Sequence, residues 1–421
     1  MGLEVALLST VPWWVFAIIV TTPIGIFSGS ELPFYLASLD KKSEKILFFN
    51  YLGTLLASFL FIGLAFKSKH TISLSVFMAL SNLLICSYFG LSPKLKNMSY
   101  LIVGLLSLSH LKTIDFQNDA RKASYLGFKL DSYQDAVNLF YAVKSSPNIY
   151  HQETPYQQID FVPKDFYSIE KNTNDWALYL NRRVQIYSDS EKLYHQTMFF
   201  LSLLHLPNKP LKILILGGGD LGLIREANRI LTQKSEIDLV ELDPAMIDLA
   251  EQGPFLNKIH PTEYKYNFFQ QDAFSFLLTN QKKYDLILAD FPFPTNYDLM
   301  KLYSVEFYKL VNKSLLDDGV FIFDYPFFTH NSQEHKEGQK IILKTLSSAG
   351  LNFQVWGKFE TFVLATKSKK FHRKSIFEYQ EYLANDVVSN FINRTDHFSY
   401  DLKQVRINSI FKPVRSFTID K

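Results

Sequence analysis

The sequence has 421 residues, a formal net charge of +3 and a single cysteine, Cys86. One cysteine excludes an intramolecular disulfide and any metal site built from several cysteines, and so mild a charge gives no reason to expect nucleic acid as a partner. The length predicts two or three structural units. Composition changes near residue 112: the chain is almost entirely apolar before it, and charged residues recur every few positions after it.

The first part, residues 1–112, is predicted to be a multi-pass membrane region of three or four helices. Residues 46–66 and 72–92 are apolar runs of about 20 residues, the length that crosses a bilayer as a helix. A run at about 11–38 predicts a further helix, and a shorter one at about 98–111 either a tilted span or an interfacial helix. Lysines flank each loop, so the positive-inside rule leaves the orientation open. We expect these helices to anchor the chain in the lipid bilayer.

The rest of the chain divides into four stretches. Residues 113–150 are expected to be a linker. Residues 151–190 alternate apolar and polar positions, with turn residues around Asn172 to Asn174 and Asn181 to Arg183, and predict a small antiparallel β subdomain. Residues 191–366 predict the main domain, and residues 367–421 a C-terminal extension.

The main domain opens with a helical pattern from Glu191, followed by a continuous apolar strand at 211–216. The strand runs directly into Gly217-Gly218-Gly219-Asp220-Leu221-Gly222, and a helix is expected at about 223–231. A second strand at 237–242 contains Glu241 near its end. This order predicts an α/β Rossmann-like, doubly wound sheet of the class I methyltransferase type.

Acidic residues close the successive strands of this sheet. Glu241 ends the second strand, Asp272 follows the third, and Asp290 follows a fourth strand at 284–289. Glycines allow the backbone to approach a ligand closely, and an acid about 20 residues after the glycine turn accepts hydrogen bonds from ribose hydroxyls. The turn alone could be purely structural, but three acids at strand ends favour a ligand crevice. Because no lysine of P-loop type follows the glycines, a nucleoside triphosphatase is not indicated.

At this point the sequence resembles the spermidine synthases, or polyamine aminopropyltransferases, and in particular their membrane-bound bacterial branch with a shortened membrane region. The resemblance is carried by ordered motifs over about residues 155–365: Gln185, Tyr194-His195, Gly217-Gly218-Gly219-Asp220, Arg225-Glu226, Val240-Glu241-Leu242-Asp243-Pro244, Asp272-Ala273-Phe274, Asp290-Phe291-Pro292-Phe293-Pro294, Leu302-Tyr303-Ser304 and Glu306-Phe307-Tyr308. Gly29 to Pro33 and Tyr51 to Leu56 are similar to later membrane helices of that branch, and Asn408 to Pro413 more weakly to its closing segment.

The resemblance implies a polyamine aminopropyltransferase that moves an aminopropyl group from decarboxylated S-adenosylmethionine to putrescine or another amine. It also implies the site residues: Asp290 as catalytic acid; Gly217 and Gly219 in the turn, Glu241 at the ribose, Asp272 at the adenine, and Asp220 with Gln185 at the aminopropyl end; Tyr194 and His195 on the amine side. No metal is required for such a transfer. An inner-membrane enzyme with its catalytic domain in the cytoplasm follows, because the presumed donor is made there.

Among the departures from the family pattern, two bear most directly on the site. The family has a second aspartate three residues after the catalytic one, where this chain has Phe293, and Leu221 places a side chain in a turn that tolerates almost none in the family. Glu360 offers one replacement for the lost acid. Either the acceptor amine has changed or efficient catalysis has been lost.

Two other functions stay open on the sequence. A methyltransferase that uses S-adenosylmethionine has this fold and the ribose acid, although Asp220 would repel the carboxylate of that donor. A degenerate membrane protein that only binds a nucleoside or polyamine is the alternative outside catalysis. The sequence also leaves open whether the chain forms a homo-oligomer.

Overall fold

The computed structural model describes residues 113–127, 132–163, 176–231, 235–252, 265–294, 296–324, 333–356, 361–369, 371, 383 and 401–414. The predicted membrane region at 1–112 lies outside these residues. Within the described ranges, no helix is both long and apolar enough to cross a bilayer.

Contacts divide the chain into two compact units, residues 1–155 with 159–174, and residues 156–158 with 175–421. The first unit contains α6 (Thr113–Leu126), α7 (Tyr133–Ser145), β1 (Tyr150–Glu153) and most of β2 (Gln158–Pro163). The stretch expected to be a linker therefore contains two helices. In α7 the side chain of Ser132 caps the first turn by accepting from the Asp135 amide, and the helix buries Ala136, Leu139 and Val143. This spacing of three and four is an amphipathic pattern that the linker prediction missed.

A buried carboxylate organises the first unit. Asp160 on β2 is fully buried, and it accepts hydrogen bonds from the Tyr125 hydroxyl at 2.7 Å and from Nδ1 of His151 at 2.6 Å. Arg121 lies 3.6 Å away through Nε. These partners satisfy a charge that would otherwise be costly to bury.

The second unit is built on a seven-stranded sheet with the order β10-β11-β9-β8-β5-β6-β7. Its strands are β5 (Lys212–Gly217), β6 (Glu236–Glu241), β7 (Asn267–Gln270), β8 (Tyr284–Asp290), β9 (Leu315–Asp324), β10 (Asn352–Trp356) and β11 (Phe362–Thr366). Strands β5 to β9 of this sheet pair in parallel, whereas β11 pairs antiparallel with both β9 and β10. This confirms the Rossmann-like sheet of class I methyltransferase type.

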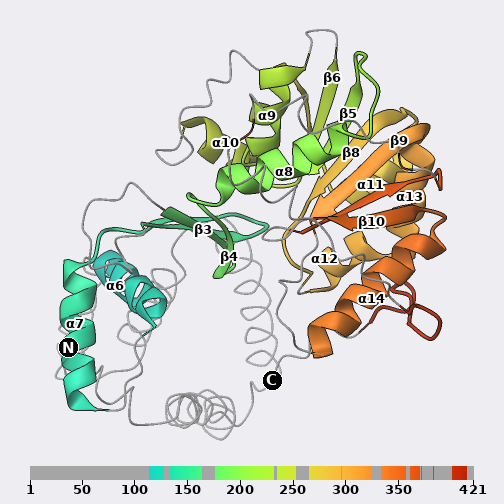
Figure 1. The fold of residues 1–421 in the computed structure, drawn as a ribbon. Helices are drawn as coiled ribbons and strands as arrows, with labels where there is room; N and C mark the ends of the chain where they lie inside the picture. The colour runs from blue at the N-terminus through green and yellow to red at the C-terminus, as the bar shows by residue number, and fades with distance from the viewer. Residues whose placement is uncertain are drawn as a thin grey trace, which may run out of the picture. The chain divides into compact units, whose positions relative to one another are not determined.

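Helices cover both faces of this sheet (Figure 1). One face packs against α8 (Glu191–Leu203), α9 (Gly222–Ile230) and α10 (Pro244–Gln252), and the other against α11 (Ala273–Thr279), α13 (Val305–Ser314) and α14 (Gln333–Ser348). The central strands are apolar on both sides: Ile213 and Ile215 belong to the first apolar cluster, and Leu214 and Leu216 to the second. That is why the strand at 211–216 reads as a continuous apolar run.

The predicted antiparallel strands precede this domain. β3 (Trp176–Leu180) and β4 (Arg183–Tyr187) form a hairpin closed by Asn181 and Arg182, which have φ of 50° and 64°. A two-residue loop with both φ positive is the type I′ geometry that fits the twist of a hairpin. The turn predicted at Asn181 is confirmed, and the turn predicted at 172–174 lies outside the described residues.

A segment of the C-terminal extension is fastened to the second unit. Asn408 is buried, and its amide nitrogen donates to the carbonyls of Met300 and Tyr303 at 2.9 and 3.1 Å. Its backbone amide donates to Thr345 in α14.

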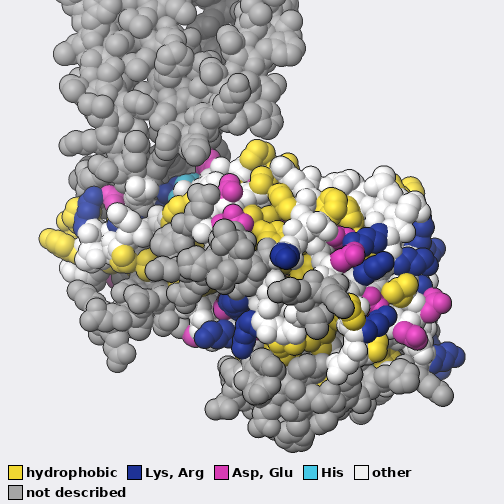
Figure 2. All heavy atoms as spheres, turned by 90° about the horizontal axis from the view of Figure 1, so that it is seen from above, with side chains coloured by type: hydrophobic (Ala, Val, Ile, Leu, Met, Phe, Trp, Pro, Cys, Tyr) yellow, Lys and Arg dark blue, Asp and Glu magenta, His cyan; other side chains and the backbone are white. Residues whose placement is uncertain are grey.

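Acidic and basic side chains are interspersed, with apolar ones between them, on the face drawn in Figure 2.

Candidate active site

Three carboxylate residues lie in one row across the sheet, at the carboxyl ends of its parallel strands. Gly217 on β5 pairs with Asp290 on β8, and the preceding pair of β5 and β6, Leu216 with Val240, places Glu241 on the other side of Gly217. Beyond Asp290, Ala289 pairs with Phe323, so Asp290 is followed across the sheet by Asp324 on β9. This edge is where open α/β sheets bind their ligands.

The glycine turn after β5 brings the backbone against this row. Gly217 has φ +79°, and a Cβ there would lie 2.1 Å from the carbonyl oxygen of Asp290. At Gly218, with φ +70°, a Cβ would lie 3.3 Å from Oδ2 of Asp290, and at Gly219 it would lie 2.9 Å from Oε2 of Glu241. The turn therefore brings the backbone close to both acids, and Gly218 belongs to it as well. The close approach to a ligand stays a prediction.

Leu221, the departure noted in the turn, has a left-handed backbone with φ 61° and ψ 12° as the N-cap of α9. Its side chain is completely buried in the apolar cluster. The side chain thus packs into the core and contributes to stability, although the backbone conformation is one that leucine adopts at a cost of roughly 1–2 kcal/mol.

We expect Leu221→Gly to be more stable than Leu221→Ala by about 1 kcal/mol, with both less stable than the wild type. Both variants lose the buried side chain, but only glycine relieves the left-handed strain. In an ordinary helix the order of glycine and alanine is the reverse. Thermal and denaturant unfolding of the three proteins measure the order, and a glycine variant less stable than the alanine variant would contradict the strain.

Tyr194, from α8, orients the catalytic candidate. Its hydroxyl donates to Oδ1 of Asp290 at 2.6 Å, although the two residues are 96 positions apart. Burial, and after it the nearby Asp220 charge, raises the pKa of Asp290 to about 6, while His195 and the Tyr194 hydrogen bond pull it down. A carboxylate with a pKa in this range can take up and release a proton near neutral pH.

His195 lies completely buried between two acids. Its Nδ1 lies 2.8 Å from Oε1 of Glu191, one helical turn earlier, and its Nε2 lies 3.1 Å from Oδ2 of Asp220. Burial opposes a charge on the imidazole, but Asp220 and Glu191 together raise the pKa of His195 well above its ordinary value. The same pairing holds the pKa of Asp220 below its usual range in spite of burial. Both groups are therefore charged.

The ion pair of His195 with Glu191 extends to further charged residues whose roles were not predicted. Arg225 on α9 donates to Glu191 at 2.6 Å and to Glu226 at 2.9 Å. Gly222 fits against the imidazole, because a Cβ there would lie 2.3 Å from the ring of His195. The four-residue spacing of Glu191 and His195 in a predicted helix is a signal that could have indicated the contact between these two residues.

Glu241 is held by the backbone on both oxygens. Oε2 accepts from the Gly219 amide at 3.2 Å and Oε1 from the Asp243 amide at 2.8 Å. Each carboxylate oxygen has a second acceptor position, so Glu241 retains capacity for ligand hydroxyls. Burial raises the pKa of Glu241 to about 7 although these amides lower it.

Asp272 caps α11 by accepting from the amide and hydroxyl of Ser275. It also lies 3.0 Å from Nζ of Lys301, in the short η3 helix (Lys301–Tyr303). Burial would raise the pKa of Asp272, but Ser275 and Lys301 hold it below its usual range. The lysine partner was not predicted, since it comes from a different part of the chain.

Gln185, like Asp272, makes no described hydrogen bond or ion pair with another predicted site residue. On β4, its amide nitrogen donates to the backbone carbonyls of Arg183 and Val184, at 3.0 and 3.3 Å. A place at the aminopropyl end therefore stays a prediction for this residue.

His195, Asp220 and Asp290 each offer one ligand atom, and these atoms all lie within 4.8 Å of one another. Such a cluster can bind a cation. One of these atoms, Nε2 of His195, already lies 3.1 Å from Asp220. The two aspartates can attract an organic cation as well as a metal ion.

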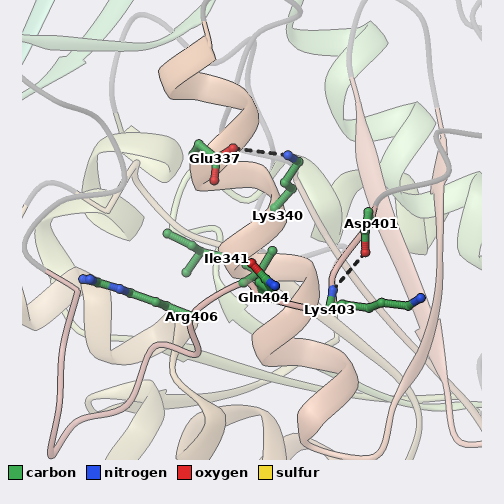
Figure 3. Close-up of a pocket in the computed structure, with 8 residues that line it drawn as sticks. Glu337, Lys340, Ile341, Asp401, Lys403, Gln404 and Arg406 are labelled. Carbon is green, nitrogen blue, oxygen red and sulfur yellow. Dashed lines mark hydrogen bonds and ion pairs between the residues drawn. The ribbon is translucent and has the colours of Figure 1, made fainter.

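A cavity of about 470 Å³ lies away from the strand ends, between α14 and residues 401–406 (Figure 3). It is lined by Glu337, Lys340, Ile341, Asp401, Lys403, Gln404, Val405 and Arg406. Glu337 pairs with Lys340, and the side chains of Lys403 and Arg406 extend away from each other (Figure 3). Without converging polar groups it has no arrangement for chemistry, so the sheet edge is the candidate active site.

The sheet order, the glycine turn and the acids at its edge define a Rossmann-like protein of the class I methyltransferase type. Residues 191–358 match the Spermine/spermidine synthase domain family. Residues 191–358 are thus similar to the spermine/spermidine synthase domain, and curated relatives of the chain are aminopropyltransferases, which are transferases.

Two curated relatives match most of the chain. A "Polyamine aminopropyltransferase" of Oceanobacillus iheyensis is 28% identical over 83% of this chain and 67% of the relative. "Polyamine aminopropyltransferase 2" of Aquifex aeolicus is 30% identical over 63% of this chain and 52% of the relative. The chain spans between half and two thirds of the length of these relatives. A solved spermidine synthase in complex with the transition state analogue AdoDATO is 19% identical, with a TM-score of 0.44, over 58% of this chain and 83% of that one.

Proposed function

We propose that this protein transfers the aminopropyl group of decarboxylated S-adenosylmethionine to an amine of the putrescine type and releases methylthioadenosine. The observation that carries the proposal is Asp290: a carboxylate with a pKa of about 6, oriented by the Tyr194 hydroxyl, at the glycine turn of the family's domain.

In this reaction the nitrogen of the acceptor attacks the carbon beside the sulfonium. The new carbon–nitrogen bond forms as the carbon–sulfur bond breaks, and the bonding pair passes to sulfur, which becomes a neutral thioether. The nitrogen must lose a proton. Tyr194 occupies Oδ1 of Asp290, and Oδ2 stands over Gly218, where it can accept that proton.

The acids suit a cationic donor. Asp220 is charged and its Oδ1 is fixed by the Gly222 amide at 2.9 Å, so it attracts the sulfonium and the ammonium of the aminopropyl group. Glu241 has the free acceptor positions that ribose hydroxyls need. Asp272 would reach the adenine after its pairing with Lys301 has opened or shifted.

A methyltransferase is the second candidate, supported by the shared fold alone. Its donor carries a carboxylate, which the charged Asp220 would repel, although His195 offsets part of that charge. A protein that binds without catalysis is supported by Phe293, at the position of the family's second aspartate. The intact Tyr194–Asp290 pair counts against it.

The deciding experiment is calorimetric binding of decarboxylated S-adenosylmethionine, S-adenosylmethionine and methylthioadenosine to the purified chain, with Glu241→Ala as control. Aminopropyl transfer requires preference for the decarboxylated donor and for the thioether, both lost in the control. Preference for S-adenosylmethionine would favour a methyltransferase. Binding of none of them would favour a degenerate protein.

The affinity for methylthioadenosine is expected to rise with pH through about 7, because only the ionised form of Glu241 accepts from both ribose hydroxyls. Since the ligand prefers the deprotonated protein, affinity falls by up to about tenfold per pH unit below that pKa and is level above it. In Glu241→Gln binding is weaker and nearly independent of pH. Calorimetry from about pH 5.5 to 8.5 tests this, and an unchanged pH profile in the variant would assign the titration to another group.

We also propose that residues 1–112 anchor the chain in the inner membrane, with the catalytic unit on the cytoplasmic side. The support is the pair of apolar runs at 46–66 and 72–92. Release of the protein from membranes by alkaline carbonate would count against anchoring, and protease access in sealed vesicles reports the side.

A further inference from the structure

The row of acids at the sheet edge continues past the catalytic candidate. Along β6, β5, β8 and β9 it reads Glu241, Gly217, Asp290 and Asp324, and Asp324 is paired on its far side with Phe362 of β11. Adjacent strands lie about 4.8 Å apart. The nucleoside acid Glu241 therefore lies to one side of the glycine turn, and Asp324 lies about one strand beyond Asp290 on the opposite side.

This order sets a direction for the two substrates. With the ribose at β6 and the reacting carbon near Asp290, the acceptor must approach from the β9 side. The next acid in that direction is Asp324. The residue at the position of the family's second aspartate cannot bind the acceptor by charge, because it is Phe293, which packs against the apolar cluster on the α13 face of the sheet. Residue 360, the replacement considered from sequence, lies outside the described residues.

Tyr194 connects the two acids. Its hydroxyl donates to Asp290, and its ring packs on Phe362 at 5.5 Å, the residue paired with Asp324. Burial, followed by the charges of Asp290 and Asp324, raises the pKa of Tyr194 well above its ordinary value, so both carboxylates act on one phenol. Phe323, which precedes Asp324, lies 6.3 and 5.9 Å from the rings of Tyr303 and Tyr308. Phe323, Tyr303 and Tyr308 pack in the apolar cluster on the α13 face of the sheet, whereas Tyr194 and Phe362 pack on the α8 face.

We propose that Asp324 binds the second ammonium group of a short diamine, while the first amine nitrogen lies at Asp290. This deepens the proposed aminopropyl transfer and rests on it. Asp324 supplies the carboxylate missing at Phe293 from a neighbouring strand, and the methylene chain of the diamine lies along Tyr194. A monoamine of the same length has no group for Asp324, so Asp324 determines specificity for diamines.

The test compares putrescine with butylamine, which has the same four-carbon chain and one amine. Transfer from decarboxylated S-adenosylmethionine is followed by product mass in the wild type, Asp324→Asn, Asp324→Glu and Asp318→Asn. Asp318 is an exposed acid on the same strand and serves as the matched control. For Asp324→Asn we expect the KM of putrescine to rise about tenfold to a hundredfold, the loss of one charged hydrogen bond, with kcat little changed. Butylamine should be used as before, and Asp324→Glu should recover part of the affinity.

Equal loss for both amines in Asp324→Asn, or an unchanged KM for putrescine, would overturn the role of Asp324. Calorimetric binding of putrescine to the complex with methylthioadenosine separates this inference from the proposed function. If the wild type transfers to neither amine but binds putrescine in that complex, and Asp324→Asn does not, aminopropyl transfer fails and Asp324 stands as the diamine site. If the wild type neither transfers to nor binds either amine, the inference is overturned together with the transfer.

Discussion

Asp290→Asn is expected to lower the rate of aminopropyl transfer by about a hundredfold to ten-thousandfold, while methylthioadenosine still binds with little change. Asparagine keeps the size of the side chain and can still meet the Tyr194 hydroxyl, but it cannot accept a proton from the attacking nitrogen. Initial rates and calorimetry on the same protein measure the two effects. Asp298→Asn removes an exposed acid nearby and serves as control.

The direction in which the transfer rate changes with pH follows from the pKa of Asp290. Burial, with the Asp220 charge as the next contribution, raises the pKa of Asp290 to about 6, and only the ionised form acts as a base. The rate therefore falls as pH drops through about 6. The hydrogen bond from Tyr194 lowers that pKa, so Tyr194→Phe should move the acidic limb to higher pH. A variant Asp290→Asn with wild-type rates would show that proton removal does not pass through this residue.

Gly217→Ala is expected to destabilise the second unit by more than about 3 kcal/mol and to abolish activity. The added Cβ would lie 2.1 Å from the carbonyl oxygen of Asp290, which belongs to the backbone of the adjacent strand and cannot rotate away. The left-handed φ of +79° adds strain of its own.

Gly350→Ala separates the cost of the left-handed backbone from the cost of the contact between the added Cβ and the adjacent strand. Gly350 also has a left-handed φ, +82°, but its nearest neighbour is the side-chain amide of Asn312 at 3.1 Å, which can move. We expect it to lose about 1–2 kcal/mol, the conformational cost alone. Denaturant unfolding of both variants gives the comparison, and equal losses would mean that the contact with Asp290 adds nothing.

The pairing around His195 also stabilises the fold, with a pH dependence that follows from its direction. A histidine whose folded pKa is raised contributes stability that is present below its unfolded value, near 6.5, and is lost as pH rises through the folded value. Asp220, with its pKa lowered, contributes above its ordinary value of 3.8 and loses that contribution as pH falls. The pair is therefore strongest between these limits, where both groups are charged.

The sequence by itself determined the order of elements in the main domain. The apolar strand at 211–216, the glycine turn and the acids at strand ends depend on local properties: strand periodicity, backbone freedom at glycine, and the rule that parallel strands present their carboxyl ends on one edge. That is why Glu241 and Asp290 were predicted from the strand pattern, whereas the role of Asp220 was implied by the resemblance to the family. The helices of 113–150 were not predicted, although the buried face of α7 has the spacing of an amphipathic helix.

Tertiary structure alone decided the contacts between groups far apart in the chain. The Tyr194 hydrogen bond to Asp290 spans 96 residues, and the Lys301 pairing with Asp272 joins η3 to α11. The charge on His195 depends on two acids that only the packing of α8 against the glycine turn brings together. Asp324 could not be recognised from sequence, because its place beside Asp290 follows from the lateral order and register of β8 and β9, and neither is encoded in local spacing.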